Sequence, residues 1–318
     1  MAQKKIILDL DTGIDDALAI AYALGSPEVE LIGILASYGN VLTEQSARNS
    51  LAILDFFGHP EVPVFMGCTH SWTTDSFSVL PISAFIHGKN GIGEVEIPAS
   101  SRSVSPVHGV DFLIESVHKY GKDLIFIPTG PQTNLATAIK KDPTIVDEIG
   151  NVVFMGGALT VPGNIENIAE ANISQDPEAT DFVFKSGIPC TMVGLDITLK
   201  VLLTKKETQT WRDLGTPQGK FLADMTDYYI KAYETTSPHL GGCALHDPLA
   251  VGVAVDPTLI KTHAINLQCD LEGVMRGRTI GDPSRLSEPA ETIEVGLGVD
   301  IDRALKEFMS RLTALVKG

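Results

Sequence analysis

Four aspartates within eight residues are the first feature of this sequence that could do chemistry. Asp9, Asp11, Asp15 and Asp16 lie in the stretch IILDLDTGIDDALA, residues 6–19. Carboxylates this close together repel one another unless a cation, a proton or bound hydroxyl groups compensate their charge. No thiol or imidazole lies nearby, so a cation here would be a hard, oxygen-binding one: Ca²⁺, Mg²⁺ or Mn²⁺. A single aspartate would be read as an ordinary helix N-cap.

A predicted strand and a predicted helix position these aspartates. Residues 6–8 form a compact apolar run, Gly13 allows a sharp turn, and residues 15–24 carry apolar residues at helical spacing. Open α/β sheets bind their ligands at the carboxyl ends of the strands. The aspartates are therefore expected at a ligand site.

The rest of the chain repeats this alternation of strand and helix. Further strands are expected at 29–37, 62–66, 124–128, 152–155 and 190–193. The pattern predicts an α/β fold with a mostly parallel, doubly wound Rossmann-like sheet flanked by helices. Residues 274–279 and 291–297 alternate like antiparallel edge strands and predict a small antiparallel extension near the C-terminus. No linker or repeat interrupts the pattern, so residues 1–318 are expected to form a single domain.

Composition restricts the partners. A formal net charge of -16 argues against nucleic-acid binding, which depends on Lys and Arg contacts to phosphate. The 4 cysteines lie far apart without a CxxC pair, so neither a zinc site nor a disulfide framework is expected. The apolar run at the N-terminus is too short for a signal peptide, and no stretch reaches membrane-spanning length. These features predict a cytoplasmic protein without a membrane partner.

Three aromatic residues could belong either to the core or to a functional site. Tyr229 and Tyr233 lie one helical turn apart, a spacing more typical of a core than of a site. His246 precedes Asp247 and Pro248 at a predicted helix start, and a histidine in that position is more often structural than catalytic.

Taken together, the segments resemble the inosine-uridine-preferring nucleoside hydrolase family of nucleoside N-ribohydrolases. The match runs in chain order over most of the sequence and comprises LDLDTGIDDALA, SYGN, HGKNGIG, IPTGPQTN, VFMGGA, GNIENIAEAN, VGLDIT, DYYIKAY and LHDPLAV. The resemblance implies hydrolysis of the N-glycosidic bond of ribonucleosides to free base and ribose. It also implies a homodimer or homotetramer and a role in nucleoside salvage.

The resemblance further implies one Ca²⁺ at the bottom of a ribose pocket. Its protein ligands would be Asp11, Asp16, Asp247 and the backbone carbonyl of Thr129, with water and the ribose 2′ and 3′ hydroxyls completing the shell. Asp11 would also be the general base that takes a proton from the Ca²⁺-bound water. An acidic pocket then stabilises the positive charge of an oxocarbenium-like transition state.

The same resemblance assigns the contacts to sugar and base. The residues expected around the ribose are Asp15, Asn40, Met155, Asn164, Glu170, Asn172 and Asp247. His246 is the candidate acid for the leaving base, and the base pocket is expected to contain His87, Tyr229 and Tyr233. His87 falls in a long polar loop, so it is expected to close over bound nucleoside.

Departures from the family pattern bear on base preference. Thr12 stands where many members have proline, and Ala171 stands where well-studied members often have an aromatic residue. Trp72 and Trp211, the 2 tryptophans, lie outside the matched segments. Because one subgroup sandwiches purines between tryptophans, this favours a broad or pyrimidine-tolerant enzyme over one that only stacks purines.

Two other function classes fit part of the pattern. In a haloacid-dehalogenase-type phosphatase, Asp9 would accept a phosphoryl group beside Mg²⁺. Gly13 stands where that motif needs threonine, and Gly281-Asp282 lacks its acidic partner. The other alternative is a non-catalytic nucleoside- or ribose-binding protein, although the candidate base Asp11 is present. An EF-hand is excluded because a strand precedes the acidic turn.

Overall fold

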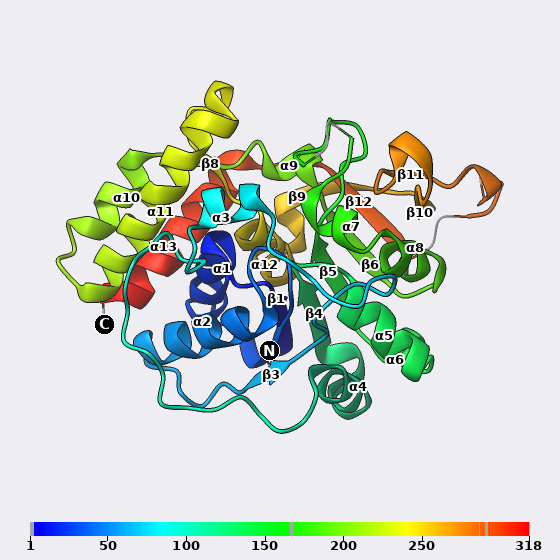
Figure 1. The fold of residues 1–318 in the computed structure, drawn as a ribbon, viewed down its shortest axis with the longest axis horizontal. Helices are drawn as coiled ribbons and strands as arrows, with labels where there is room; N and C mark the ends of the chain where they lie inside the picture. Colours follow the sequence, from blue (N-terminus) through cyan, green and yellow to red (C-terminus); the bar gives the residue numbers. More distant parts are fainter. Residues whose placement is uncertain (1–2, 166–167, 286, 290–291, 318) are drawn as a thin grey trace.

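A sheet of eight strands forms the centre of the computed structural model, which describes residues 3–165, 168–285, 287–289 and 292–317 (Figure 1). The strand order is β3-β2-β1-β4-β5-β6-β12-β9. Their bounds are β1 (Lys4–Leu10), β2 (Val29–Ala36), β3 (Val64–Met66), β4 (Leu124–Pro128), β5 (Asn151–Met155), β6 (Cys190–Val193), β9 (Ile260–Ala264) and β12 (Ile293–Val299). Only β9 runs antiparallel to its neighbour. The predicted mostly parallel sheet is confirmed.

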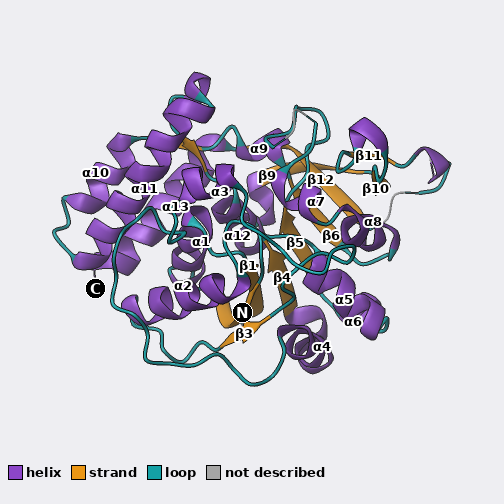
Figure 2. Cartoon of the chain, in the orientation of Figure 1, coloured by secondary structure: helices purple, strands orange, loops and turns teal. Residues whose placement is uncertain are grey.

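Helices cover both faces of the sheet (Figure 2). The hydrophobic core on one face includes residues of α1 (Ile14–Leu24), α2 (Thr43–Phe56), α9 (Leu195–Thr198), α10 (Lys205–Arg212), α11 (Pro217–Thr236), α12 (Asp247–Val255) and α13 (Ile301–Lys317). The core on the other face includes residues of α4 (Gly109–Tyr120), α5 (Thr133–Lys141), α6 (Ile145–Glu148), α7 (Ala171–Gln175) and α8 (Pro177–Lys185). None of the helices in the described ranges combines the length and apolarity needed to cross a bilayer.

Strand β1 shows why both faces are buried. Its side chains alternate, so Ile6, Leu8 and Leu10 join the first core while Ile7 joins the second. From β1 the chain proceeds outward to β2 and β3, then returns to β4 on the other side of β1. The carboxyl ends of β1 and β4 therefore form the topological switch point, where open α/β sheets bind ligands.

The C-terminal strands differ from the prediction. Residue 291, where the second edge strand was expected to begin, lies outside the described residues. Strand β12 is not an edge strand: it pairs in parallel with β6, Ile293 opposite Cys190, and antiparallel with β9. The alternation of buried and exposed residues showed a strand, but pairing is decided by residues distant in sequence.

The prediction of an edge strand at 274–279 is also largely wrong. Residues Gly273–Met275 form a 3₁₀ turn, and only β11 (Thr279–Gly281) pairs, antiparallel, with β10 (Leu267–Cys269). A second small antiparallel pair joins β7 (Leu202–Leu203) to β8 (Cys243–Ala244). The predicted small antiparallel extension therefore exists, with different bounds.

The packing of α13 gives a prediction about stability. Phe308 is 1% exposed and its ring contacts Tyr22 and Trp211 edge-on, with centroids 5.5 and 6.0 Å away. Replacing it, Phe308→Ala, is expected to lower the free energy of unfolding by about 3–5 kcal/mol, because a cavity replaces a buried ring. Urea denaturation measures the change. The control Lys306→Ala, exposed on the same helix, is expected to change it by less than about 0.5 kcal/mol; equal effects would contradict the packing.

Candidate active site

The β1–α1 turn separates the four aspartates into two environments. Asp9 is on β1, and its Oδ1 accepts a hydrogen bond of 2.9 Å from Asn134 on α5. Burial raises the pKa of Asp9 to about 7. Because the Asp9 side chain is bonded to Asn134 on α5 and does not line the pocket described below, it is not placed to accept a phosphoryl group as the phosphatase interpretation requires. Asp11, Asp15 and Asp16 belong to the other environment.

Asp15 and Asp16, in the first turn of α1, meet Asp247, the first residue of α12. One carboxylate oxygen of each lies within 4.8 Å of the others. The packing of α12 against α1 brings them together. Burial raises the pKa of Asp15 and of Asp16 to about 6, and burial with the charge of Asp15 raises the pKa of Asp247 well above its usual range. An all-oxygen set of mutually repelling groups fits a hard divalent cation.

Asp11 lies beside this cluster and is held by Asn40. The Asn40 backbone N–H donates to Asp11 Oδ2 at 2.5 Å, and its side-chain Nδ2 donates to Oδ1 at 3.3 Å. Burial, followed by the charge of Asp16, raises the pKa of Asp11 well above its usual range. Gly39 precedes with φ of +154°, and a Cβ there would come within 2.0 Å of Asp11 Oδ2. Only glycine lets the backbone approach this carboxylate so closely.

Thr129, which follows β4, connects the carboxylates to the opposite wall. Its hydroxyl donates to Asp16 Oδ1 at 2.8 Å, and its carbonyl accepts from Asn172 Nδ2 at 2.6 Å. Asn172 on α7 also donates to the carbonyl of Met155 at 3.2 Å. Glu170 caps α7, where its carboxylate accepts from the backbone N–H of Asn172 and two other residues. These bonds define one side of a pocket.

The pocket at the switch point is lined by every residue predicted to contact ribose or base, together with Thr129 and His246. Asp11 and Asp16 do not line it. Sequence reasoning missed Ile82 and Ile86, which come from α3 (Pro81–His87), and Ile165. Apolar residues at a spacing of four were a weak signal of α3 inside a segment expected to be a loop.

Helix α3 packs against α11 (Figure 1), and its last residue, His87, reaches the β1–α1 turn. His87 Nδ1 accepts a hydrogen bond of 3.1 Å from the backbone N–H of Ile14. Its ring lies 5.5 Å from that of Tyr229. Burial lowers the pKa of His87 to about 4, so its imidazole is neutral at neutral pH.

A chain of hydrogen bonds runs along the pocket wall from α1 through α11 to His246, the residue before α12, and ends on α9. The Tyr229 hydroxyl donates to Asp15 Oδ2 at 3.2 Å and lies 3.5 Å from the Tyr233 hydroxyl. Tyr233 Oη lies 2.7 Å from His246 Nε2, and His246 Nδ1 lies 2.8 Å from Thr198 Oγ1. Burial lowers the pKa of His246 to about 4. Thr198 was not among the predicted site residues.

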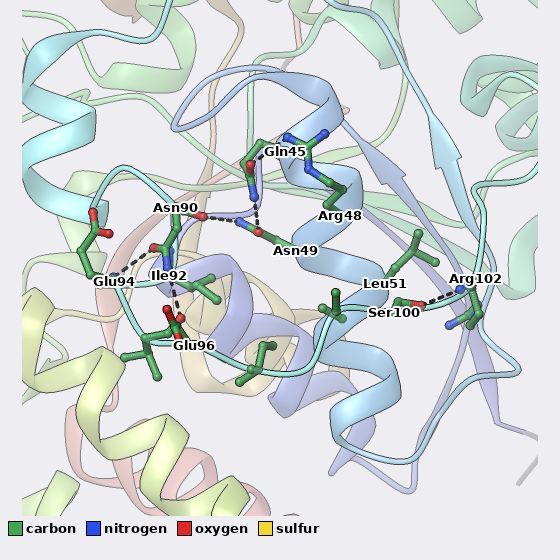
Figure 3. Close-up of a pocket in the computed structure, with 14 residues that line it drawn as sticks. Gln45, Arg48, Asn49, Leu51, Asn90, Ile92, Glu94, Glu96, Ser100 and Arg102 are labelled. Atoms are coloured by element: carbon green, nitrogen blue, oxygen red, sulfur yellow. Dashed lines mark hydrogen bonds between the residues drawn. The ribbon is translucent and has the colours of Figure 1, made fainter.

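Helix α2 is hydrogen-bonded to the β1–α1 turn and also lines a second hollow of about 550 Å³ (Figure 3). Asn49 lines this hollow, and its Nδ2 donates to the carbonyls of Thr12 at 3.0 Å and Asn90 at 2.9 Å. The Thr12 hydroxyl lies 3.0 Å from that of Ser46 and 2.7 Å from that of Ser50. Hydrogen bonds to α2 therefore hold the turn at Thr12, the position where the family pattern has proline.

The carboxyl pKa values predict how cation binding depends on pH. Because the pKa values of Asp15 and Asp16 are raised in the folded protein, protonation of these two carboxyl groups stabilises the cation-free fold. This stabilisation is complete below the ordinary pKa of 3.8 and is lost as pH rises through about 6. Protons therefore compete with a cation below about pH 6. The rise in Tm given by saturating Ca²⁺ is expected to be larger at about pH 7.5 than at about pH 5.

Scanning calorimetry of chelator-treated protein measures this rise at both pH values. Asp16→Asn should abolish it, whereas Asp213→Asn, an exposed carboxylate outside the site, should retain it. A rise of equal size at both pH values would contradict the competition between protons and cation.

Comparisons with known proteins agree over nearly the whole chain. Residues 6–306 match the family model described as inosine-uridine preferring nucleoside hydrolase. The chain is 36% identical over 282 residues to the protein so named from Crithidia fasciculata, with 88% of each covered. It is 34% identical over 317 residues to the probable uridine nucleosidase 2 of Arabidopsis thaliana, with 98% of each covered. The solved structure of a purine-preferring ribonucleoside hydrolase from Gardnerella vaginalis is 66% identical, with a TM-score of 0.98 and 99% of each chain covered.

Proposed function

Because the chain belongs to the inosine-uridine preferring nucleoside hydrolase family, whose members are enzymes that cleave nucleosides, we propose that its switch-point pocket hydrolyses ribonucleosides to free base and ribose. One observation carries the proposal: a single pocket is lined both by clustered carboxylates and by a tyrosine–histidine chain that ends on Asp15. Carboxylates suit ribose hydroxyls and developing positive charge, whereas neutral hydrogen-bonding groups suit a leaving base.

The cation of this site is proposed to be Ca²⁺, held by Asp11, Asp16, Asp247 and the carbonyl of Thr129. When bound, Ca²⁺ would supply a Lewis acid that lowers the pKa of a water and anchors ribose hydroxyls. The Thr129 carbonyl accepts from Asn172 but has a second lone pair to offer. Asp15 also lies within ligand distance. Because the Tyr229 hydroxyl already occupies its Oδ2, we assign its other oxygen, which is buried without a partner among the described residues, to a ribose hydroxyl.

Asp11 is proposed as the general base. The two N–H groups of Asn40 orient its carboxylate. Asp11 takes a proton from the attacking water as the water oxygen bonds to the anomeric carbon. The bond between that carbon and the base nitrogen breaks, and its electron pair leaves with the base. The surrounding carboxylates stabilise the positive ribose ring while both bonds are partly formed.

The leaving base is proposed to be neutralised by Tyr233 and His246. Their contact at 2.7 Å places the tyrosine hydroxyl between His246 Nε2 and Tyr229 in the wall of the pocket. A base anion that accepts a hydrogen bond or a proton there is a better leaving group. His87 and Tyr229 complete the wall around the base.

Purine ribonucleosides are proposed as the preferred substrates. The 66% identical relative from Gardnerella vaginalis is named purine-preferring, which opposes the expectation drawn from the positions of the tryptophans. No tryptophan is among the described residues that line the pocket. Apolar surface for a base ring comes instead from Ile82, Ile86 and Ile165. Purine preference therefore does not need stacking between two tryptophans.

Base preference gives a kinetic prediction. With Ca²⁺ present, kcat/KM is expected to be about tenfold higher for inosine than for uridine, because the larger ring covers more of the apolar wall. Chromatographic detection of free base and ribose measures both. Faster cleavage of uridine would contradict the proposed preference, and no release from any ribonucleoside would contradict the proposed function.

The leaving-group assignment predicts a dependence on substrate. His246→Ala is expected to lower kcat for inosine by about 10²-fold or more, because the hypoxanthine anion is a poor leaving group. The same change should alter the rate for nitrophenyl riboside little, because nitrophenolate leaves without an acid. Release of hypoxanthine and of nitrophenolate is followed spectroscopically. His118→Ala, an exposed histidine, serves as the control. Equal losses on both substrates would show that His246 does not assist the leaving group.

A further inference from the structure

Thr198 has a buried hydroxyl that makes one side-chain hydrogen bond among the described residues, and its partner is the proposed leaving-group machinery. It ends α9 and is 0% exposed. Its Oγ1 lies 2.8 Å from Nδ1 of His246. Among the described residues no other hydrogen-bond partner of Thr198 Oγ1 is found. Its hydroxyl proton therefore has one available acceptor.

The direction of this hydrogen bond follows from counting donors and acceptors. A buried hydroxyl proton left without an acceptor costs free energy, so Thr198 donates to Nδ1 of His246. A nitrogen that accepts carries no proton, so the single proton of the neutral imidazole is on Nε2. Nε2 lies 2.7 Å from Tyr233 Oη, which therefore accepts.

The remaining bonds continue in the same direction. With its oxygen accepting from His246, Tyr233 has its own proton to donate, and its nearest partner, Tyr229 Oη, is 3.5 Å away. Tyr229 in turn donates to the carboxylate of Asp15 at 3.2 Å, which is acceptor-only when ionised. The opposite direction would leave the Thr198 proton without an acceptor. The long contact leaves the Tyr233 proton available to a ligand.

We propose that Thr198 is a positioning residue that holds His246 with Nε2–H on Tyr233, so that the Tyr233 hydroxyl donates to the leaving purine. Hydrogen bonds that run in one direction polarise one another, so accepting from His246 makes the Tyr233 hydroxyl a stronger donor than it would be without that bond. Thr198 touches neither the ribose nor the base in this arrangement. It has this role only if the chain cleaves nucleosides as proposed above.

Paired substrates test the role of Thr198 in the Ca²⁺-loaded enzyme. Thr198→Val keeps the shape and removes the hydroxyl, and it should lower kcat for inosine about tenfold, as expected for one buried hydrogen bond. The rate for nitrophenyl riboside should be unchanged. Thr198→Ser keeps the hydroxyl and should restore the inosine rate. Thr226→Val, at another 0% exposed threonine whose hydroxyl has no partner among the described residues, should match the unmodified enzyme on both substrates.

The outcomes separate the two proposals. Suppose that the unmodified enzyme cleaves both substrates. The role of Thr198 alone is then overturned if Thr198→Val cleaves inosine as fast as the unmodified enzyme, or if it is slowed equally on both substrates. An unmodified enzyme that cleaves neither would overturn the proposed function with it.

A measurement on the unmodified protein needs no folded variant. NMR of isotope-labelled imidazole nitrogens reports which ring nitrogen of His246 carries the proton, with His246→Gln identifying the signals. A protonated Nε2 and an unprotonated Nδ1 are expected. A proton on Nδ1 would overturn the inference.

Discussion

Repulsion among buried carboxylates is the constraint on which the rest of this structure depends. Asp15, Asp16 and Asp247 approach within ligand distance while almost fully buried, and Asp11 stands beside them. Burial and mutual repulsion both raise their pKa values, so the site is neutralised either by protons or by a cation. A site of this kind has a use when positive charge appears during a reaction, as it does on a ribose ring that loses its base.

The fold holds these groups in place through the sheet and its two cores. Strand β1 lies inside the sheet, between β2 and β4, and contributes to the cores on both faces, so packing on both sides fixes the turn that follows it. Gly39 and Asn40 after β2, Thr129 after β4 and Asp247 on α12 then converge on that turn. Because these groups come from distant parts of the chain, cooperative folding is what brings the carboxylates together.

The sequence predicted the parts of the site that depend on local spacing. Asp11 follows a strand and Asp16 lies in the first turn of a helix. This pattern predicts a cation site without comparison to any related protein. Asp9 was grouped with them by proximity, but alternation along β1 places it with Ile7, toward α5. Thr198 gave no local signal, because its partner His246 is 48 residues away. The pairing of β12 with β6 is likewise a long-range choice that alternation cannot reveal.

Calcium binding and hydrolysis measured on one sample show whether the carboxylate cluster is a Ca²⁺ site that hydrolysis requires. Chelator-stripped protein would be titrated with Ca²⁺ by calorimetry, and portions taken along the titration would be assayed for release of hypoxanthine from inosine. One bound Ca²⁺ per chain is expected, with activity rising in proportion to the bound ion. Full activity in the stripped protein, or Ca²⁺ binding without any gain in hydrolysis, would contradict this expectation.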